Sequence, residues 1–421
     1  MFMQTKPTSR RGCLVVITMA MWTTAVTHGA EGVRTLPDSA AALGMAGGRF
    51  ANLDDPSVTR SNPANLPLLR EDALMINVQP WYGQTDFTGL DGRKDSMIEP
   101  WKPLGSLYAV MPINDDMTFG LGITAPFGIA ISWPRDGAFR YIAPYDAVLQ
   151  TAALNPAIGV KLSKSVSFGI GLDIFYSRLK LDQAFPWTAV TGAPASDGDM
   201  TFEGDGWGLG AYAGFTFKLA EHHRLAVTGR LPVKVDYDGD FTISNLPAAV
   251  RGVFSERSSF DSEIEHPGSI GVGYGVDVTD RLTFGIDYEW IQNSAHDSLP
   301  LNIGSNQALL PVSELDLEWR DSYTIGAGFE YKLTPAWMLR AGYMFSKSPL
   351  RDRTYTPSIP TNDRHLCSIG AGYTRGRHTI DFAYSFVPME TRHVDGAATP
   401  AFDGDYEIEW HVFTLSYTRR F

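Results

Sequence analysis

The most restrictive feature of this chain is a two-residue alternation of apolar with polar or small side chains, which recurs along most of its length. Between residues 319 and 333 the odd positions are almost wholly apolar, whereas the even positions are polar or glycine. Side chains of a strand point alternately to opposite faces, so this segment predicts a strand with one oily face and one polar face. A sheet of such strands buries its oily face either against a second sheet, as in a soluble sandwich, or against lipid.

The length of the apolar runs and the position of the charged residues favour a sheet whose apolar face lies against lipid. Beyond the leader, no apolar run reaches the roughly 20 residues that a membrane-spanning helix needs, so a closed β-barrel is the remaining way to cross a bilayer. The polar face of the predicted strands carries ionisable residues such as Asp287, Glu289 and Arg340. A soluble sandwich would not bury a face of this kind, whereas a barrel lumen can pair or hydrate the charges. We therefore predict a barrel and keep the sandwich as the alternative.

Residues 1–30 look like a secretory signal peptide. Three basic residues precede an apolar stretch at residues 13–26, and the small residues Gly29 and Ala30 offer a cleavage site. Removal of the leader takes away three positive charges and no acidic one, so the net charge goes from −12 to −15. An acidic mature chain disfavours nucleic acid as a partner. A cleaved leader followed by a barrel predicts a place in the outer membrane of a Gram-negative type of cell.

Fourteen candidate strands predict an all-β fold, a 14-stranded antiparallel transmembrane β-barrel over residues 72–421. Their approximate limits are 72–83, 103–112, 117–133, 147–162, 165–185, 205–219, 224–241, 265–278, 282–295, 317–333, 337–347, 364–374, 377–388 and 406–421. Short turns alternate with long loops along this series, as in outer-membrane barrels with periplasmic turns and extracellular loops. The even strand number allows closure, and the chain ends on the periplasmic side at Phe421.

Residues 31–71 do not have the pattern of membrane strands. Small residues between Ser39 and Gly48 favour a short helix, and turn residues such as Pro56 and Pro63 follow. Because the segment is small and apolar rather than long and charged, we expect a hatch, or plug, inside the lumen.

One predicted strand, at residues 165–185, is apolar on both faces. Its even positions face lipid in the predicted register, and its odd positions face the lumen. The lumen-facing apolar residues are Phe175, Leu179, Leu181 and Phe185. An apolar lining suits a hydrophobic solute better than water, so these residues are candidate ligand contacts. The alternative is that they only pack against the hatch.

Proline interrupts another predicted strand, at residues 117–133. Pro126 cannot donate to the strand ladder, and Gly128 lacks a side chain, with Phe127 between them. We expect these three residues to kink the strand inward and to leave a gap in the wall, through which a hydrophobic solute would leave sideways into lipid. A harmless bulge near the rim is the alternative.

Candidate polar contacts inside the barrel are few. Arg230 and Lys234 share the inward parity of the strand at 224–241, and they either hold a solute carboxylate or pair with a neighbour such as Asp236. The sequence has no phosphate-binding loop, no metal-ligand cluster at a recognised spacing and no local signature of a catalytic triad. We therefore expect a protein that is not an enzyme and that uses no cofactor and no metal.

Several segments, through their order and spacing, resemble the FadL-type outer-membrane transporters of long-chain fatty acids and aromatic hydrocarbons. They are Ser61 to Ala64, Leu107 to Phe127, Gly204 to Gly208, Trp319 to Asp321 and Ser346 to Leu350. The resemblance covers nearly all of the chain after the leader. Within the first segment, Asn62, Pro63 and Ala64 match the Asn-Pro-Ala element of that family's hatch.

The resemblance implies a monomeric barrel, closed by its hatch, that takes up a hydrophobic solute passively. The solute is caught among the extracellular loops, moves to an inner apolar site and leaves at the kinked third strand after the hatch shifts. The expected partners are this small-molecule ligand, the lipid of the outer membrane, and the barrel-assembly machinery, which would bind the C-terminal strand ending at Phe421.

One departure from the family pattern leaves the solute open. Characterised fatty-acid members hold the carboxylate with basic residues, and Gln183 and Leu315 stand at two such positions here. The main hypothesis is a transporter of long-chain fatty acids or similar amphiphiles, and the alternative is a transporter of neutral aromatic or alkane hydrocarbons. An outer-membrane lipid-modifying enzyme, a structural or adhesin barrel and a general porin are weaker hypotheses. No catalytic spacing supports the enzyme, an adhesin does not require Pro126, and an apolar, plugged lumen suits ions and sugars poorly.

Overall fold

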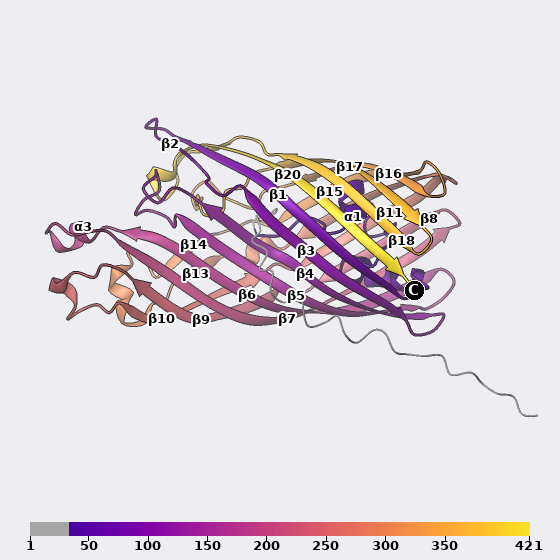
Figure 1. The fold of residues 1–421 in the computed structure, drawn as a ribbon, viewed down its shortest axis with the longest axis horizontal. Coiled ribbons are helices and arrows are strands. Elements are labelled where there is room, and N and C mark those ends of the chain that lie inside the picture. The colour runs from indigo at the N-terminus through magenta and orange to yellow at the C-terminus, as the bar shows by residue number, and fades with distance from the viewer. Residues whose placement is uncertain (1–32) are drawn as a thin grey trace, which may run out of the picture.

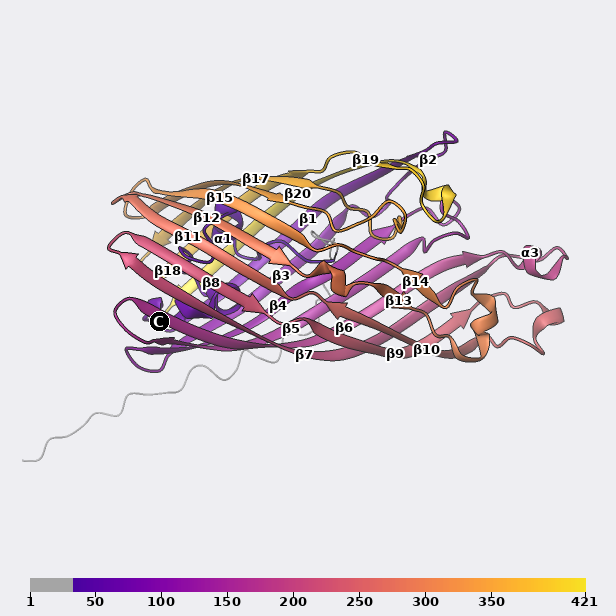
Figure 2. The ribbon, with the colours of Figure 1, turned by 180° about the vertical axis from the view of Figure 1, so that it is seen from behind.

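The chain closes into one antiparallel β-barrel, whose long axis lies horizontally in Figures 1 and 2. The computed structural model describes residues 33–421, so the leader expected at residues 1–30 lies outside the described residues. The predicted 14-stranded barrel is confirmed. The ring is completed where β1 (Ala73–Gly89) pairs with β20 (Gly404–Arg420), with Ala73 opposite Arg420.

The other wall strands follow one another around the barrel. They are β3 (Trp101–Pro112), β4 (Met117–Ser132), β5 (Asp146–Lys161), β6 (Val166–Phe185), β7 (Gly198–Ala220), β8 (His223–Arg230) with β9 (Val233–Ile243), β10 (Arg257–His266) with β11 (Ser269–Thr279), β12 (Leu282–Ile291), β15 (Ser322–Lys332), β16 (Trp337–Ser346), β17 (Arg364–Arg375) and β18 (His378–Pro388). Two of the fourteen are each built from a pair of segments, because Pro232 and Pro267 interrupt their ladders.

Short helices and strands lie in the loops of this wall and in its lumen. The loops carry β2 (Lys94–Ser96), β13 (Ser298–Pro300), β14 (Glu314–Asp316), β19 (Arg392–Val394), α3 (Trp187–Thr191) and the 3-10 helices η3 (Ala248–Val250), η4 (Asn293–Ala295), η5 (Gly304–Leu309) and η6 (Pro400–Phe402). The segment before β1 carries α1 (Ala40–Met45), α2 (Val58–Ser61) and the 3-10 helix η2 (Pro63–Leu68). No helix among residues 33–421 is long and apolar enough to cross a membrane.

The alternation in the sequence becomes the two faces of the wall. In β15, Ile325 and Phe329 point outward and are 41% and 48% exposed, whereas Thr324 between the outward positions is 3% exposed and faces inward. The same division holds in β6, where Ile170 and Leu172 are outside. An apolar outer surface is stable only against lipid, because in water it would be a very large exposed apolar patch.

Several strands are longer or start later than the sequence pattern predicted. At the long-loop end, β1 continues to Gly89 and β7 begins at Gly198, because these ends rise beyond the apolar band, where the outer face turns polar and the alternation fades. In contrast, β15 begins only at Ser322. Trp319 therefore does not belong to the lipid-facing row: it follows Glu318, whose φ is +46°, and is buried inside.

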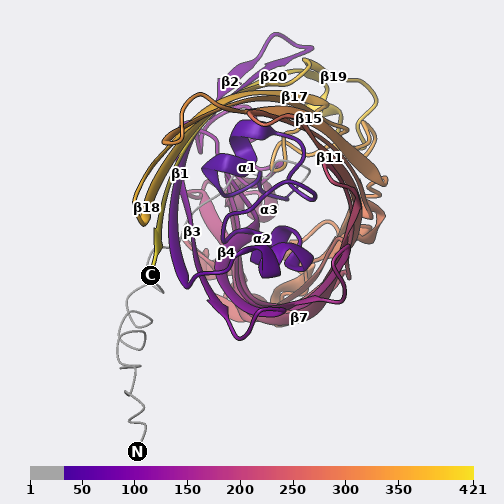
Figure 3. The ribbon, with the colours of Figure 1, turned by 90° about the vertical axis from the view of Figure 1, so that its right-hand side faces the viewer.

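The segment before β1 lies inside the ring of strands, as Figure 3 shows for α1 and α2. This confirms the predicted hatch inside the lumen. Helix α1 begins at Ser39, whose Oγ accepts a hydrogen bond from the Ala42 N–H at 3.1 Å, and it ends at Ala46 in a left-handed conformation with φ of +55°. Every residue of α1 is buried.

Glycines of the wall allow the hatch backbone to approach it closely. A Cβ atom added at Gly328 or Gly342 would lie 1.8 Å from the Met45 carbonyl oxygen, which leaves no room for any side chain. On the other side of the contact, the small residues of α1 likewise allow the two backbones to approach closely. The hatch therefore docks on β15 and β16 backbone against backbone.

Polar contacts of Asn62 hold the hatch together and tie it to β7. The Asn62 side-chain amide donates to the Phe50 carbonyl oxygen at 2.7 Å and to Thr216 Oγ1 of β7 at 2.9 Å, while its Oδ1 accepts from the Ala64 N–H at 3.1 Å. Pro63 follows as the first residue of η2, where a missing N–H costs nothing. Asn62, Pro63 and Ala64 are all buried, so this motif joins the hatch to itself and to the wall.

Candidate functional site

The wall is interrupted on one side of the third barrel strand, β4. Its ladder with β3 ends at the pair Leu107 and Ile123, and on the other side its register with β5 shifts between Thr124 and Phe127. Beyond Ile123, β4 has no ladder partner in β3 among residues 33–421. The irregularity therefore lies at Pro126, and the residues after it are buried instead of alternating.

A short segment of the N-terminus takes the place that β3 leaves. We call residues 33–37 the strap. The Gly128 N–H donates to the Val33 carbonyl oxygen at 2.7 Å, and the Thr35 N–H donates to the Pro126 carbonyl oxygen at 3.1 Å. The Thr35 hydroxyl adds a bond to the Ala125 carbonyl oxygen at 2.8 Å. The free edge created by proline is thus covered by the strap, which leads directly into α1 of the hatch.

A large apolar cluster fills the lumen beside this interruption, and we call it the apolar core. All four sequence-predicted residues of β6 lie in it: Phe175, Leu179, Leu181 and Phe185. Phe127 also lies in it and meets Phe175 edge to face, with ring centroids 5.8 Å apart. The kink and the apolar strand, which were separate features of the sequence, therefore meet at one place.

Most of the apolar core comes from residues that the sequence reasoning did not select. They include Trp133, Phe139, Phe202, Val233, Val235, Tyr237, Phe241, Phe260, Trp319, Tyr355 and Tyr406. In β9, the alternation of Val233, Val235 and Tyr237 indicates an apolar face. That this face points into the lumen can be predicted only if Pro232 is recognised as a break in the strand. The loop residues carry no periodic signal, because loop side chains have no fixed direction.

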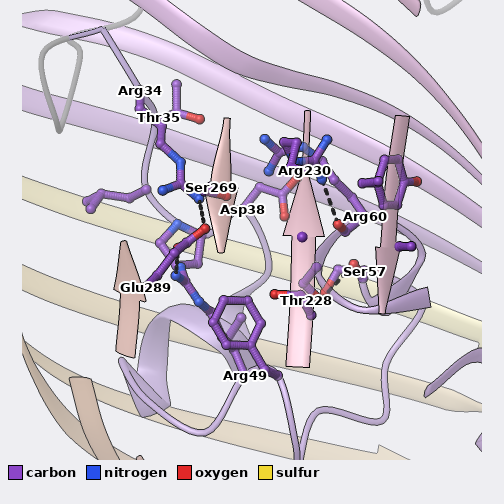
Figure 4. Close-up of a pocket in the computed structure, with 18 of the residues that line it drawn as sticks. Arg34, Thr35, Asp38, Arg49, Ser57, Arg60, Thr228, Arg230, Ser269 and Glu289 are labelled. Atoms are coloured by element: carbon purple, nitrogen blue, oxygen red, sulfur yellow. Dashed lines mark hydrogen bonds and ion pairs between the residues drawn. The ribbon is translucent and has the colours of Figure 1, made fainter. Parts of the chain in front are cut away.

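Below the apolar core, toward the short turns, the lumen becomes strongly polar. A cavity of about 60 Å³ lies between the strap, the hatch and the wall, and Figure 4 shows the residues around it. We call it the polar cavity. Four of its lining residues are arginines: Arg34, Arg49, Arg60 and Arg230.

Carboxylates of the wall pair with three of these arginines. Arg34 of the strap meets Glu289 of β12 at 2.7 Å, and Arg49 of the hatch pairs with the same carboxylate. Arg230 of β8 pairs with Asp173 of β6, and its guanidinium also donates to the Arg60 carbonyl oxygen at 2.9 Å. These bonds join strap, hatch and wall, so they anchor the plug in place.

The hatch itself contains two perturbed titratable groups. Burial raises the pKa of the Asp55 carboxyl to about 6, although Ser57 and Ser39 donate hydrogen bonds to it. Burial also lowers the pKa of the Arg60 guanidinium. Arg60 Nε has no hydrogen-bond partner among the described residues.

The two basic residues predicted to face the lumen together are separated by the structure. Arg230 faces inward, as expected, but it is engaged by Asp173. Lys234 is on the outer surface, 51% exposed at the side chain, with its Nζ 2.6 Å from Glu263. The predicted inward parity of Lys234 is therefore wrong, because the break at Leu231 and Pro232 turns Val233 to the same side as Arg230.

The two residues at family carboxylate positions make no charged contact of their own. Gln183 donates from Nε2 to the Tyr141 carbonyl oxygen at 2.9 Å, and Leu315 lies in the short loop strand β14. No group of three or more His, Cys, Asp or Glu residues able to hold a metal ion occurs in the described part of the chain.

A plugged membrane barrel with an apolar core beside an interrupted wall strand defines a class of protein, the outer-membrane transporters of hydrophobic compounds. Residues 20–421 match the family model described as outer membrane protein transport protein (OMPP1/FadL/TodX), so the chain belongs to this family. The resemblance seen in the sequence is confirmed. The protein is accordingly an outer-membrane channel for hydrophobic compounds and not an enzyme.

Named relatives differ in the solutes that their names specify. The chain is 26% identical to a long-chain fatty acid transport protein of Escherichia coli, over 91% of this chain and 93% of that protein. Its fold is similar to that of a Pseudomonas aeruginosa FadL homologue, with a TM-score of 0.83, 21% identity and coverage of 93% and 100% of the two chains. It is also similar to the Ralstonia pickettii toluene transporter TbuX, with a TM-score of 0.68, 18% identity and coverage of 91% and 98%.

Proposed function

We propose that this protein carries long-chain fatty acids or similar amphiphiles passively across the outer membrane and releases them sideways at the kinked third strand, β4. The observation that supports this most is the meeting of the apolar core with the β3–β4 interruption at Phe127. A solute bound among Phe175, Leu179, Leu181 and Phe185 would lie beside the one stretch of β4 that β3 does not cover. It would then reach lipid without crossing water, once the strap moved away from Pro126 to Gly128.

Neutral aromatic or alkane hydrocarbons are the second candidate class of solute. The four β6 residues that would line the solute site are apolar, and Arg34 and Arg230 of the polar cavity are engaged by carboxylates. The E. coli relative is named for long-chain fatty acids, which favours the amphiphile, whereas TbuX is named for toluene.

Two subsidiary features belong to the same proposal. The protein would work as a monomer, and a single chain closes the ring between β1 and β20, as this requires. Its last residue, Phe421, is 49% exposed beside the start of β1, where the barrel-assembly machinery could bind the C-terminal strand during insertion.

Uptake by cells that carry or lack the protein tests the transport. Radiolabelled oleate, hexadecane and toluene would be supplied separately to the two strains at low concentration. We expect faster uptake of oleate in the strain with the protein. Faster uptake of only hexadecane or toluene would select the second class of solute, and equal rates for all three solutes would contradict transport.

A reversible cross-link tests the lateral route. Ser106 and Thr124 are the next two residues after the last β3–β4 pair, so a disulfide between cysteines at these positions would extend the ladder across the interruption. In a Cys367→Ser background, the oxidised S106C/T124C protein should lose uptake and regain it on reduction. The matched control is L107C/I123C, which links residues that already pair and should transport in both redox states. Full uptake by oxidised S106C/T124C would exclude exit at this place.

A further inference from the structure

Two histidines are buried in the aromatic surroundings of the apolar core. His266 ends β10 and is 0% exposed, and His296 follows η4 and is 5% exposed. Their ring centroids are 6.2 Å apart. Neither residue has an ion-pair partner within residues 33–421, although histidine is polar and is fully buried mostly where hydrogen bonds satisfy it.

Aromatic packing, rather than hydrogen bonding, holds both rings. His266 stacks on Phe127 of the kink, with centroids 4.4 Å apart, and meets Phe175 edge to face at 5.6 Å. His296 stacks on Trp319 at 4.7 Å with an interplanar angle of 12°. The imidazoles are therefore fixed in orientation by residues of the kink and of the apolar core.

All four ring nitrogens of this pair lack a hydrogen-bond partner among residues 33–421. A neutral imidazole has one N–H donor and one acceptor nitrogen, so two donors and two acceptors are left unused here. Burial lowers the pKa of His296 to about 4, so this ring is neutral at pH 7. Buried polar atoms without partners destabilise a fold, and an apolar side chain at these positions would leave no such atoms. The unused hydrogen-bonding capacity therefore requires an explanation.

We propose that His266 and His296 form the polar subsite of the solute site and bind an uncharged oxygen atom of an otherwise apolar solute. This inference rests on the proposed function, because it concerns the solute that the apolar core would hold. The ligand class is a long apolar chain with one hydroxyl, carbonyl or protonated carboxyl group. A hydroxyl both donates and accepts, so it can use the acceptor of one ring and the donor of the other.

The chemistry of the surroundings selects an uncharged group over a carboxylate. The side chains that pack on the two imidazoles, Phe127, Phe175 and Trp319, carry no charge, and an ionised carboxylate buried without a cation is strongly disfavoured. The 6.2 Å between the ring centroids can be bridged by one oxygen with hydrogen bonds of about 2.8 Å to each side. A fatty acid would bind there in its protonated form.

The contact of His266 with Phe127 places the polar subsite beside the proposed lateral exit. Because His266 stacks on the kinked strand, a solute oxygen bound there lies beside the β3–β4 interruption. The polar end of the solute is then held at the kink, while its apolar chain extends among Phe175 and the other residues of the core.

Uptake of a matched pair of solutes tests the proposal. Cells with the full-length protein would receive labelled 1-dodecanol or labelled dodecane, which differ only in one hydroxyl. Substitution of His266→Phe or His296→Phe keeps an aromatic ring and removes the hydrogen bonds. We expect the uptake rate of 1-dodecanol at low concentration to fall roughly 3- to 10-fold, as for one lost hydrogen bond, while the rate for dodecane stays within twofold.

Controls separate this proposal from the proposed function and from misfolding. His378→Phe makes the same change on the outer, lipid-facing surface, beside Tyr417, and should alter neither rate. His296→Gln keeps a donor and an acceptor and should recover part of the 1-dodecanol rate. Equal losses for both solutes, or no loss for either, would overturn the polar subsite while transport itself stands. If the unsubstituted protein speeds up neither solute, nor oleate, it is the proposed function that fails.

A measurement on the unsubstituted protein covers the case in which the variants do not fold. The side-chain ¹⁵N shifts of His266 and His296, assigned through the contacts of their rings with Phe127, Phe175 and Trp319, should move when 1-dodecanol is added to the protein in detergent micelles and should not move with dodecane. Shifts that respond to both solutes alike, or to neither, would contradict the subsite.

Discussion

The two halves of the lumen are built on opposite principles. Toward the long loops, the apolar core is held by aromatic and aliphatic packing, and two buried histidines leave their hydrogen bonds unused. Toward the short turns, the hatch is held by directed bonds, because arginines of the strap and the hatch reach wall carboxylates. Within the wall at this end, Arg340 of β16 binds both Glu330 at 2.7 Å and Asp381 at 2.6 Å. The boundary runs between Asp173 and Phe175, two residues apart on β6.

Under the proposed function, the upper half holds the solute and the lower half holds the plug. Apolar packing has no fixed direction, so solutes of different shape could then replace one another in the upper half. Hydrogen-bonded ion pairs fix one geometry and make any unpaired charge costly, so the lower half favours one docked position of the hatch. Variants in the two halves should therefore differ in kind as well as in size.

The largest effect is expected from breaking an ion pair of the lower half. Asp173 is fully buried, pairs with Arg230 and accepts from Asn155 Nδ2 at 2.7 Å. Asp173→Ala leaves the arginine without its carboxylate and should lower the free energy of unfolding by about 3–5 kcal/mol. Guanidinium unfolding of the protein in lipid vesicles measures this loss.

The double variant Asp173→Leu with Arg230→Met sharpens the same test. It removes both charges, so it should recover a large part of the stability that Asp173→Ala loses. If the double variant were less stable than Asp173→Ala, the bond would not be an anchoring ion pair of the kind described.

A pair of truncations compares the two halves directly. Phe175 in the apolar core and Leu43 in α1 are both 0% exposed, and replacing either by Ala should cost about 2–5 kcal/mol of unfolding free energy. Only Phe175→Ala should also change the solute concentration at which uptake is half-maximal. A similar change in Leu43→Ala would show that solute binding is not confined to the upper half.

The docking of the hatch should depend on pH through Asp55. Its pKa is raised from 3.8 to about 6, so the folded state holds this proton more tightly than the unfolded hatch does. The contribution of Asp55 is therefore fully present below about pH 4 and is lost as the pH rises to about 6, by up to about 3 kcal/mol.

Hydrogen exchange of α1 and α2, corrected for the intrinsic exchange rate, measures this dependence. Protection of the hatch should fall between pH 4 and pH 6. Asp55→Asn cannot ionise and should reduce the dependence in this window. A persistent dependence in the variant would assign it to another group.

The smallest effect is expected at Lys234, once a candidate carboxylate contact. Its exposed ion pairs with Glu263 and Asp236 lie on the outside of β9. Lys234→Ala should change neither oleate uptake nor stability measurably, since exposed pairs contribute little. A clear loss of uptake would move the solute site away from the apolar core.

The barrel wall could be predicted from the sequence because side chains of each wall strand alternate between lipid and lumen, which gives the sequence a period of two residues. Short turns, strand number and the position of Pro126 follow from local chemistry, and the apolar odd positions of β6 end up inside the lumen. Asn62 to Ala64 and the small residues of α1 indicated the hatch, since only small residues allow such close docking.

The remaining features depend on register and on loops, which local patterns do not determine. One break at Pro232 reversed the faces of β9, so that Lys234 was assigned inward and Val233 was overlooked. Trp319 continued the period of β15 in the sequence, but the chain turns at Glu318 and carries it inside to His296. The histidine pair itself joins residues 30 positions apart that meet only because a loop folds back into the barrel.

The contact of Met45 with Gly328 and Gly342 has a consequence for the membrane as a barrier. Any side chain at either glycine would push the hatch away from the wall, and a loosely seated hatch would leave a path for water and small solutes along the barrel. Two missing side chains thus help to keep the channel tight.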